Sequence, residues 1–279
     1  MKKIILSSKS LVKTLIFCLI ILISNTIISN AEIINIGKIQ LNIEPPKGYI
    51  DVTNNVPDGI LNMFSKLNMR LLKRYEKYNS NDELDSFYHI AIDNNVINIK
   101  ATNDEVQEFF DELDETKDNE IDEIFKKGKD LAKEINENIA INDIVNLEKI
   151  RTDNSFSIIS ASKMIDQSTN KNILSVYEST FLHAADSIIM VYSYSNAYDF
   201  NVKKHIQKVK AQAKEMKEYL LKNNQNTYEK PRKKKTSFIE KIIKGGVKGI
   251  GIAIILGIIF IITKLAKMLF NHFKNKLNS

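Results

Sequence analysis

The sequence contains no tryptophan and a single cysteine, Cys18. Cys18 lies inside an N-terminal apolar run with the features of a removable export signal, so the mature chain is expected to contain no thiol. This excludes disulfide bonds and metal sites built on thiolates. One alternative is a lipoprotein signal with Cys18 as the lipidated residue. Leu15, Ile16 and Phe17 before it are bulkier than the small residues that such a signal carries.

Acidic residues are almost absent from both ends of the chain. Residues 1–31 contain four lysines and no acid, and residues 230–279 contain twelve basic residues and one acid. Residues 32–229 contain 24 basic and 33 acidic residues, a net charge of −9. An acidic domain is repelled by phosphate backbones, whereas basic segments beside a membrane are attracted to anionic headgroups. The charge therefore argues against nucleic acid as a partner and favours a lipid bilayer.

The N-terminal end has the order of a secretory signal peptide. Four lysines precede an apolar stretch at 14–24, and small residues follow at Ser29 and Ala31. Small residues at these two positions are typical of a signal-peptidase site, so we predict that residues 1–31 are a signal peptide cleaved after Ala31. The alternative is an uncleaved signal anchor. Either interpretation places residues 32 onward outside the cytoplasm.

The C-terminal end contains a second apolar segment, at 249–263, with fifteen uncharged residues. As a helix this segment is roughly 22 Å long, so a full span needs an extension to about 242–270, with flanking lysines reaching the interface. We predict one transmembrane helix at 242–270, a basic linker at 224–241 and a short basic tail at 271–279. An interfacial helix is the alternative, but 249–263 has no polar face.

The basic linker gives a conflicting signal about orientation. Its charge would place it in the cytoplasm by the positive-inside rule, whereas the export signal places it outside. We follow the export signal, because long domains translocate largely regardless of flanking charge. The linker is then expected to contact outer headgroups through Arg232, Lys233, Lys234, Lys235, Lys241 and Lys244.

Small residues recur every four positions along the C-terminal segment, at Gly245, Gly249, Ala253 and Gly257. This spacing lets two helix backbones approach closely in a membrane. It predicts homodimerisation or pairing with another membrane helix. The alternative is that these glycines only reflect the high glycine content of spanning helices.

Residues 32–223 have the pattern of one α+β domain. Apolar residues alternate in 38–44 and 86–93, which predicts two half-buried strands, the first ended by a Pro-Pro-Lys-Gly turn. A capping box at 102–105 begins a helix with Val106, Phe109, Phe110 and Leu113 on one face, and 121–135 continues the helical pattern. Four strand-like runs follow at 145–152, 155–164, 172–181 and 187–195. Their short separations favour antiparallel hairpins.

A closing helix is predicted over 202–221, because apolar residues recur there at steps of three and four. We expect it to pack on the sheet, since the heptad pattern is too short for a coiled coil. Its lysines either form the solvated side of the helix or face a membrane surface, at Lys203, Lys204, Lys208, Lys210, Lys214 and Lys217. The predicted architecture is one antiparallel sheet packed by helices.

Two short runs resemble the start of exported bacterial domains of the PsbP-like fold. They are Gly-Lys-Ile-Gln-Leu at 37–41 and Pro-Pro-Lys-Gly-Tyr at 45–49. The resemblance covers 33–223 as a pattern. It implies a binding or assembly module without catalytic residues. Tyr49 stands where that family often has tryptophan.

Catalytic and metal-binding patterns are weak throughout the sequence. The four histidines, His89, His183, His205 and His272, do not occur at i+3 or i+4 spacing, so they predict strand-face or surface positions instead of a metal site. The acidic run at 104–123 lacks the glycine that an EF-hand loop requires. A glycine-rich stretch at 245–251 follows no strand, so it is not a phosphate loop. We expect no cofactor and no metal.

The function predicted from the sequence is a non-enzymatic, membrane-tethered extracytoplasmic module that binds or helps assemble a partner. It would be a single-pass protein of a bacterial cell membrane. One alternative is an envelope hydrolase whose site forms only in three dimensions. Another is a membrane-active or oligomerising protein that acts through its glycine-spaced C-terminal helix.

Overall fold

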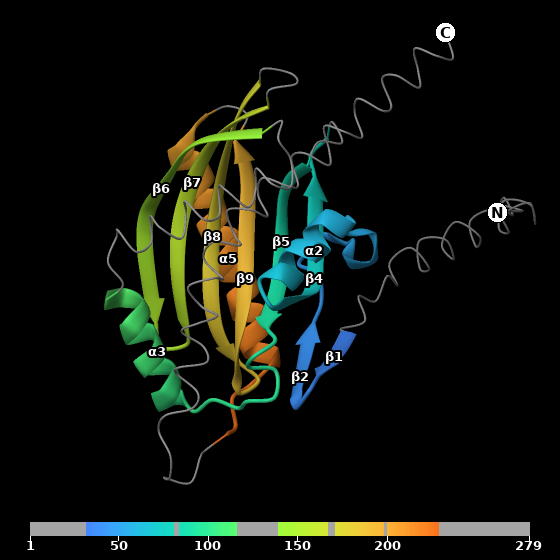
Figure 1. Ribbon diagram of the computed structural model, residues 1–279, viewed down its shortest axis with the longest axis vertical. Helices are drawn as coiled ribbons and strands as arrows, with labels where there is room; N and C mark the ends of the chain where they lie inside the picture. Colours follow the sequence, from blue (N-terminus) through green and yellow to red (C-terminus); the bar gives the residue numbers. More distant parts are fainter. Residues whose placement is uncertain (1–31, 81–83, 116–138, 167–170, 198–199, 229–279) are drawn as a thin grey trace, which may run out of the picture.

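The structure is a computed structural model that describes residues 32–80, 84–115, 139–166, 171–197 and 200–228. Its centre is a seven-stranded antiparallel sheet in the order β3-β4-β5-β9-β8-β7-β6, and a two-stranded hairpin, β1-β2, lies beside it (Figure 1). The strands are β1 (Glu32–Ile36), β2 (Ile39–Ile43), β3 (Ile50–Asp51), β4 (Met69–Tyr78), β5 (Leu84–Asp93), β6 (Ile139–Thr152), β7 (Ser155–Asp166), β8 (Lys171–Ala184) and β9 (Ser187–Ala197).

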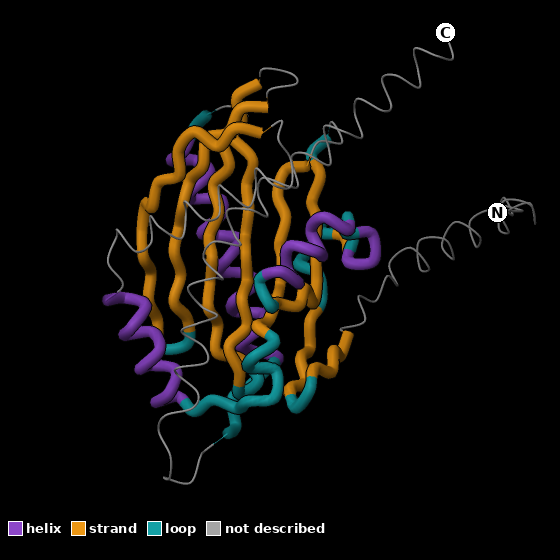
Figure 2. The backbone as a smooth tube through the Cα atoms, viewed as in Figure 1, coloured by secondary structure: helices purple, strands orange, loops and turns teal. Residues whose placement is uncertain are grey.

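The helices cover both faces of the sheet. Helix α5 (Val202–Asn223) runs behind the sheet, while α2 (Asp58–Lys66) and α3 (Asn103–Glu115) lie in front of it (Figures 1 and 2). A short 3-10 helix, η1 (Thr53–Asn55), adjoins β4. The described residues therefore form an α+β layer with helices on an antiparallel sheet, as the sequence predicts.

Strand alternation explains which side chains meet which helix. Tyr88, Ile90 and Ile92 of β5 alternate with Phe87 and His89, so the two groups point to opposite faces. Tyr88 donates a hydrogen bond to the carbonyl of Gln212 in α5 (2.9 Å), so its face is the one that α5 covers. His89, on the other face, contacts α2 through Phe64.

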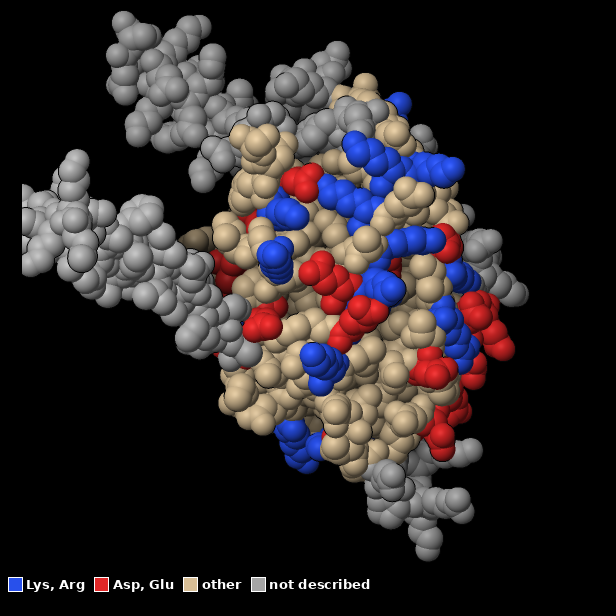
Figure 3. Space-filling model, turned by 180° about the vertical axis from the view of Figure 1, so that it is seen from behind, with Lys and Arg blue, Asp and Glu red and all other residues tan. Residues whose placement is uncertain are grey.

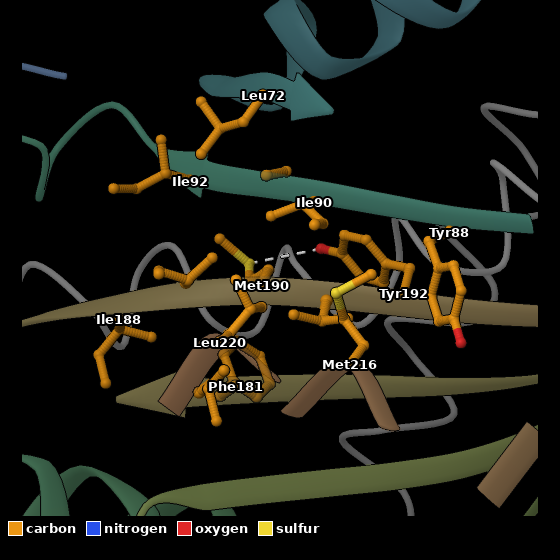
Figure 4. Close-up of a cluster of buried hydrophobic side chains, with 14 of the residues drawn as sticks. Leu72, Tyr88, Ile90, Ile92, Phe181, Ile188, Met190, Tyr192, Met216 and Leu220 are labelled. Atoms are coloured by element: carbon orange, nitrogen blue, oxygen red, sulfur yellow. Dashed lines mark hydrogen bonds between the residues drawn. The ribbon is translucent and has the colours of Figure 1, made fainter. Parts of the chain in front are cut away.

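The hydrophobic core is built around the central strands β5 and β9. Figure 4 shows Ile90 and Ile92 of β5 with Met216 and Leu220 of α5, and all four side chains are buried. A second, smaller cluster lies under the N-terminal half of α5 and includes Val209. The closing helix is therefore a packed element of the sheet, as predicted, and the apolar spacing along it is explained by this contact.

The turn that carries the resemblance motif has a structural explanation. Gly48 adopts a positive φ of 81° after β2, a conformation that favours glycine. Tyr49 follows it, is buried, and its hydroxyl lies 2.9 Å from Ser86 and accepts a hydrogen bond from Gln212 of α5. The motif thus fixes the chain after β2 to β5 and α5.

Most of the predicted elements are present, with longer bounds. Ile39, Leu41 and Ile43 of β2 are buried, as the alternation predicts. The four strand-like runs form β6 to β9 as consecutive antiparallel hairpins. The capping box is also confirmed, because Glu105 accepts hydrogen bonds from the Thr102 amide (3.0 Å) and hydroxyl (3.1 Å). Val106, Phe109, Phe110 and Leu113 of α3 are buried.

Several elements between residues 32 and 84 carry no clear sequence signal, so the predicted number of strands is too low. Strand β4 carries Lys73, Arg74 and Glu76, which are buried charged residues that conceal a strand pattern. A register shift between Leu71 and Lys73 interrupts its alternation further. Helix α2 begins after Pro57 without a side-chain cap, so it lacks the signal that identified α3.

Several predictions concern residues outside the described part. These are the signal peptide at 1–31, the helical pattern at 121–135, most of the basic linker, the transmembrane helix at 242–270 and the tail. None of the helices in the described ranges is long and apolar enough to span a membrane.

Candidate functional site

A buried polar group lies on the front face of β4 and β5. It consists of Arg74, Glu76 and His89 together with the exposed Tyr78, and we call it the Arg74 cluster. The Arg74 guanidinium contacts Glu76 Oε1 through Nε and Nη2, both at 2.7 Å, and the Tyr78 hydroxyl donates to the other Glu76 oxygen. Arg74 is 1% exposed and Glu76 is 6% exposed, so this ion pair is almost fully removed from water.

His89 completes the cluster as a neutral acceptor. Arg74 Nη1 lies 2.9 Å from His89 Nε2, and since a guanidinium can only donate, Nε2 accepts and the proton resides on Nδ1. Burial, together with the Arg74 charge, holds the pKa of His89 well below its ordinary value. Its Nδ1 has no hydrogen-bond partner among the described residues.

Aromatic rings enclose the cluster. Phe87 and Tyr194 are stacked with their centroids 4.2 Å apart, and the Arg74 guanidinium lies 5.3 Å from the Phe87 centroid. The His89 ring meets Phe64, Phe87 and Tyr194 edge-on. Low-dielectric surroundings of this kind strengthen the Arg74–Glu76 attraction but carry a large desolvation cost.

The arrangement of the Arg74 cluster is unsuited to general-base catalysis by His89. A catalytic imidazole needs an available lone pair, and the Nε2 lone pair of His89 is directed at the Arg74 guanidinium. The cluster instead joins β4 to β5 through the charge-assisted hydrogen bond from Arg74 to His89. Its chemistry is that of a structural polar network.

A serine and a histidine meet under α5. Ser195 Oγ of β9 lies 2.9 Å from His205 Nδ1 in the first turns of α5. This distance fits a nucleophile and its base. Both side chains are buried between the helix and the sheet, with Ser195 at 0% exposure, so a substrate would have to separate the two layers to reach the hydroxyl.

A third group is at the end of the sheet where α5 stops. Residues 224–228, which we call the strap, continue from α5 and lie against the turn between β8 and β9. Asp186 in this turn accepts hydrogen bonds from the backbone N–H groups of Thr227 and Tyr228, the latter at 2.8 Å, and pairs with Lys100 at 2.9 Å. Asn224 reaches β2, where its side chain accepts from Asn42 N–H and donates to Asn42 O.

His183 of β8 is buried behind the strap. Its Nε2 lies 3.3 Å from the Ala101 carbonyl, and its Nδ1 lies 3.1 Å from Asn226 Nδ2. A carbonyl can only accept, so Nε2 carries the proton and Nδ1 accepts from the Asn226 amide. Burial lowers the pKa of His183.

The lysines of α5 are divided between ion pairs and solvent. Lys208 pairs with Asp85, Lys210 with Glu148 (2.6 Å) and Lys217 with the buried Glu178 (2.9 Å). Figure 3 shows the face that α5 covers, where basic and acidic side chains are interspersed. Some lysines on the predicted solvated side of α5 therefore form ion pairs that attach the helix to the sheet.

The other candidate residues from the sequence do not form a site in the described ranges. His89, His183 and His205 lie in three separate places, and within the described ranges no group of three or more His, Cys, Asp or Glu residues could hold a metal ion. His272 lies outside these ranges, as do the predicted helix-packing residues Gly245, Gly249, Ala253 and Gly257. The predicted headgroup contacts Arg232, Lys233, Lys234, Lys235, Lys241 and Lys244 lie outside them too.

Sequence reasoning missed the Arg74 cluster and the contacts of the strap. Arg74 and Glu76 were hidden in an unrecognised strand, and their link to His89 depends on the pairing of β4 with β5. Asn226 was assigned to the linker, and its contact with His183 joins positions 43 residues apart. The only available signal was the asparagine-rich run after α5, since asparagine side chains bond backbone groups at chain ends and turns.

Comparison with known proteins gives no match to a family model, to a curated protein or to a solved structure.

Proposed function

We propose that this protein is a membrane-tethered extracytoplasmic module that binds or helps assemble a partner and performs no chemistry of its own. The proposal is supported by the position and charge of the segment that leaves the domain after α5. A domain of net charge −9 ends in a strap held at one end of its sheet, and a basic segment begins two positions after Tyr228, with eight Lys and Arg residues before the apolar stretch at 249–263. The segment 242–270 then supplies the anchor.

Binding is favoured over catalysis by the use of the buried charges. Arg74 is engaged with Glu76, Lys217 with Glu178, and Lys100 with Asp186. The Lys217–Glu178 pair joins α5 to β8 and the Lys100–Asp186 pair joins two loops, whereas Arg74 and Glu76 pair within β4. All three pairs stabilise the scaffold. The resemblance to PsbP-like exported domains supports the same class of function.

The partner of the anchor is proposed to be another membrane helix or a second copy of this chain. The small residues Gly245, Gly249, Ala253 and Gly257 would form the contact. The six basic residues of the linker would lie among outer headgroups. The same four-residue spacing of small side chains also supports the alternative that this helix is membrane-active.

The hydrolase alternative rests on Ser195 and His205. A fluorophosphonate probe, which reacts with activated serines, would label Ser195 if the layers open to admit substrate. If the protein is a binding module, the native chain and the Ser195→Ala variant should be labelled to the same extent. Labelling of the native chain that disappears in the Ser195→Ala variant would favour the hydrolase.

The proposal is tested by extracting cell membranes with alkaline carbonate. The full chain should stay in the membrane pellet, and a chain ending at residue 229 should be released. The variant with Arg232, Lys233, Lys234 and Lys235 changed to Gln serves as a matched control, because it removes charge but keeps the span and should stay in the pellet. Release of the full chain would contradict the proposal.

A further inference from the structure

The strap is held by an asparagine whose amide orientation is fixed by three hydrogen bonds. Asn226 Nδ2 donates to the His183 carbonyl (3.0 Å), and Asn226 Oδ1 accepts from the Asp186 amide (2.8 Å). The remaining Nδ2 hydrogen points at His183 Nδ1, 3.1 Å away. Rotating the amide by 180° would break the first two bonds, so Asn226 presents only a donor to the ring.

The His183 ring is likewise fixed in one tautomer. Its Nε2–H is directed at the Ala101 carbonyl, which leaves Nδ1 as the nitrogen that can take up a proton. A proton on Nδ1 would face the Asn226 N–H, and two donors cannot share a hydrogen bond. The ring is buried, so water cannot replace the lost partner while the strap is docked.

The charged groups around His183 come from two elements. Asp186 lies on its own hairpin, and Lys100 lies on the loop before α3, where it pairs with Asp186. From the strap, the titratable side chain is Tyr228, whose ring lies 5.8 Å from Lys100 Nζ. The β6–β7 turn contributes the Asn154 carbonyl, which accepts from the His183 backbone N–H. Asp186 favours a charged imidazole, but it is already engaged by Lys100, Thr227 and Tyr228.

We propose that His183 and Asn226 form an acid-sensitive latch that holds the strap on the domain at neutral pH and releases it when His183 takes up a proton. Release adds residues 224–228 to the tether, about 17 Å of extended chain. It also exposes the β8–β9 turn. The latch would sense the pH of the external medium only if the domain is extracytoplasmic, as proposed above. Its opening by acid depends on the domain alone.

The size of the effect follows from linkage. Burial lowers the pKa of His183 in the docked state, so docking is fully favoured above the ordinary histidine pKa and weakens as pH falls below it. For an undocked histidine of pKa about 6.5, the docking equilibrium falls by up to about 30-fold between pH 7.5 and pH 5.0. Asp186 also has a lowered pKa, because its hydrogen bonds outweigh the effect of burial, but it would contribute only below about pH 4.

The test is amide hydrogen exchange of the full chain in lipid nanodiscs. The reporters are the amides of Thr227 and Tyr228, which bond Asp186, with rates corrected for the intrinsic effect of pH. Protection in the native chain should fall by several-fold, up to about 30-fold, from pH 7.5 to 5.0. Amides of β9 serve as an internal control and should stay protected, which distinguishes release of the strap from unfolding.

Two variants separate the latch from other acid effects. His183→Asn keeps an acceptor near the Nδ1 position and cannot take up a proton, so its strap should stay docked at both pH values. Asn226→Ala removes the docking contact, so its strap should exchange rapidly at both. The proposal would be overturned if strap protection in the native chain were the same at pH 7.5 and pH 5.0. It would also be overturned if the Asn226→Ala chain showed the same pH dependence as the native chain. These readouts are independent of carbonate extraction, so failure of the latch and failure of the membrane assignment are distinguishable.

Discussion

The buried Arg74–Glu76 pair makes a quantitative prediction about stability. Replacing Arg74 with Met removes the guanidinium and leaves the Glu76 carboxylate in a site that is 6% exposed. Replacing Glu76 with Leu leaves an unpaired guanidinium that is 1% exposed. Breaking a buried pair from one side costs about 3–5 kcal/mol of unfolding free energy, because the remaining charge is desolvated without a partner.

The double variant Arg74→Met, Glu76→Leu should recover most of that loss. It leaves no buried charge at the site, and an apolar side chain in place of Arg74 can pack against Phe87. His89 Nε2 and the Tyr78 hydroxyl lose their hydrogen bonds to the cluster, so the recovery is incomplete. The unfolding free energy of the double variant is expected within about 1–2 kcal/mol of the native chain, which gives a coupling energy of about 3 kcal/mol or more. The assay is urea denaturation of the detergent-solubilised chain, followed by far-UV circular dichroism.

An exposed ion pair provides the control for this cycle. Arg151 pairs with Asp111 at 2.6 Å, with 31% and 62% of the two side chains exposed. Asp111→Asn should cost less than about 1 kcal/mol, since water screens both charges. If either single replacement in the Arg74 cluster costs no more than this control, or if the two costs simply add in the double variant, the interpretation of the cluster as a buried, mutually dependent pair is refuted.

Two glycine replacements should have opposite effects. Gly37 has φ of +58° in the β1–β2 turn, and an added Cβ would lie 2.6 Å from the Ile97 carbonyl oxygen, so Gly37→Ala should destabilise the domain by more than about 1 kcal/mol. Gly59 is the second residue of α2, and an added Cβ would meet no atom within 4 Å beyond its chain neighbours and the backbone of its own helix, so Gly59→Ala should stabilise the domain by up to about 0.5–1 kcal/mol. Both are checked by the same urea denaturation, and a stabilising Gly37→Ala would contradict the described turn.

Elements with a local chemical signal could be predicted from the sequence. The alternation of Ile39, Leu41 and Ile43 identified β2, and the capping box identified the start of α3. The hairpins β6 to β9 were recognised because short turns join strongly β-prone runs. Each of these signals lies within a few residues of the element that it specifies.

Elements that depend on distant partners could not be predicted. Charged residues of β4 are compatible with burial only because Glu76 and His89 surround Arg74, and that arrangement requires strand pairing. The strap resembles a polar linker until Asp186 and His183 are placed beside it. A sequence pattern records the preference of a residue, whereas the contact of Arg74 with His89 joins positions 15 residues apart and that of Asn226 with His183 joins positions 43 residues apart.

The sidedness of the chain tests the central claim most directly, and the lack of other thiols makes it measurable. In a Cys18→Ser background, Ser80→Cys places a unique thiol at an exposed position of the domain, and Ser279→Cys places one at the end of the tail. A membrane-impermeant maleimide added to intact cells should label the Ser80→Cys chain and should label the Ser279→Cys chain only after lysis. Protection of Ser80→Cys in intact cells, with labelling after lysis, would contradict the assignment of an extracytoplasmic domain on a single membrane span.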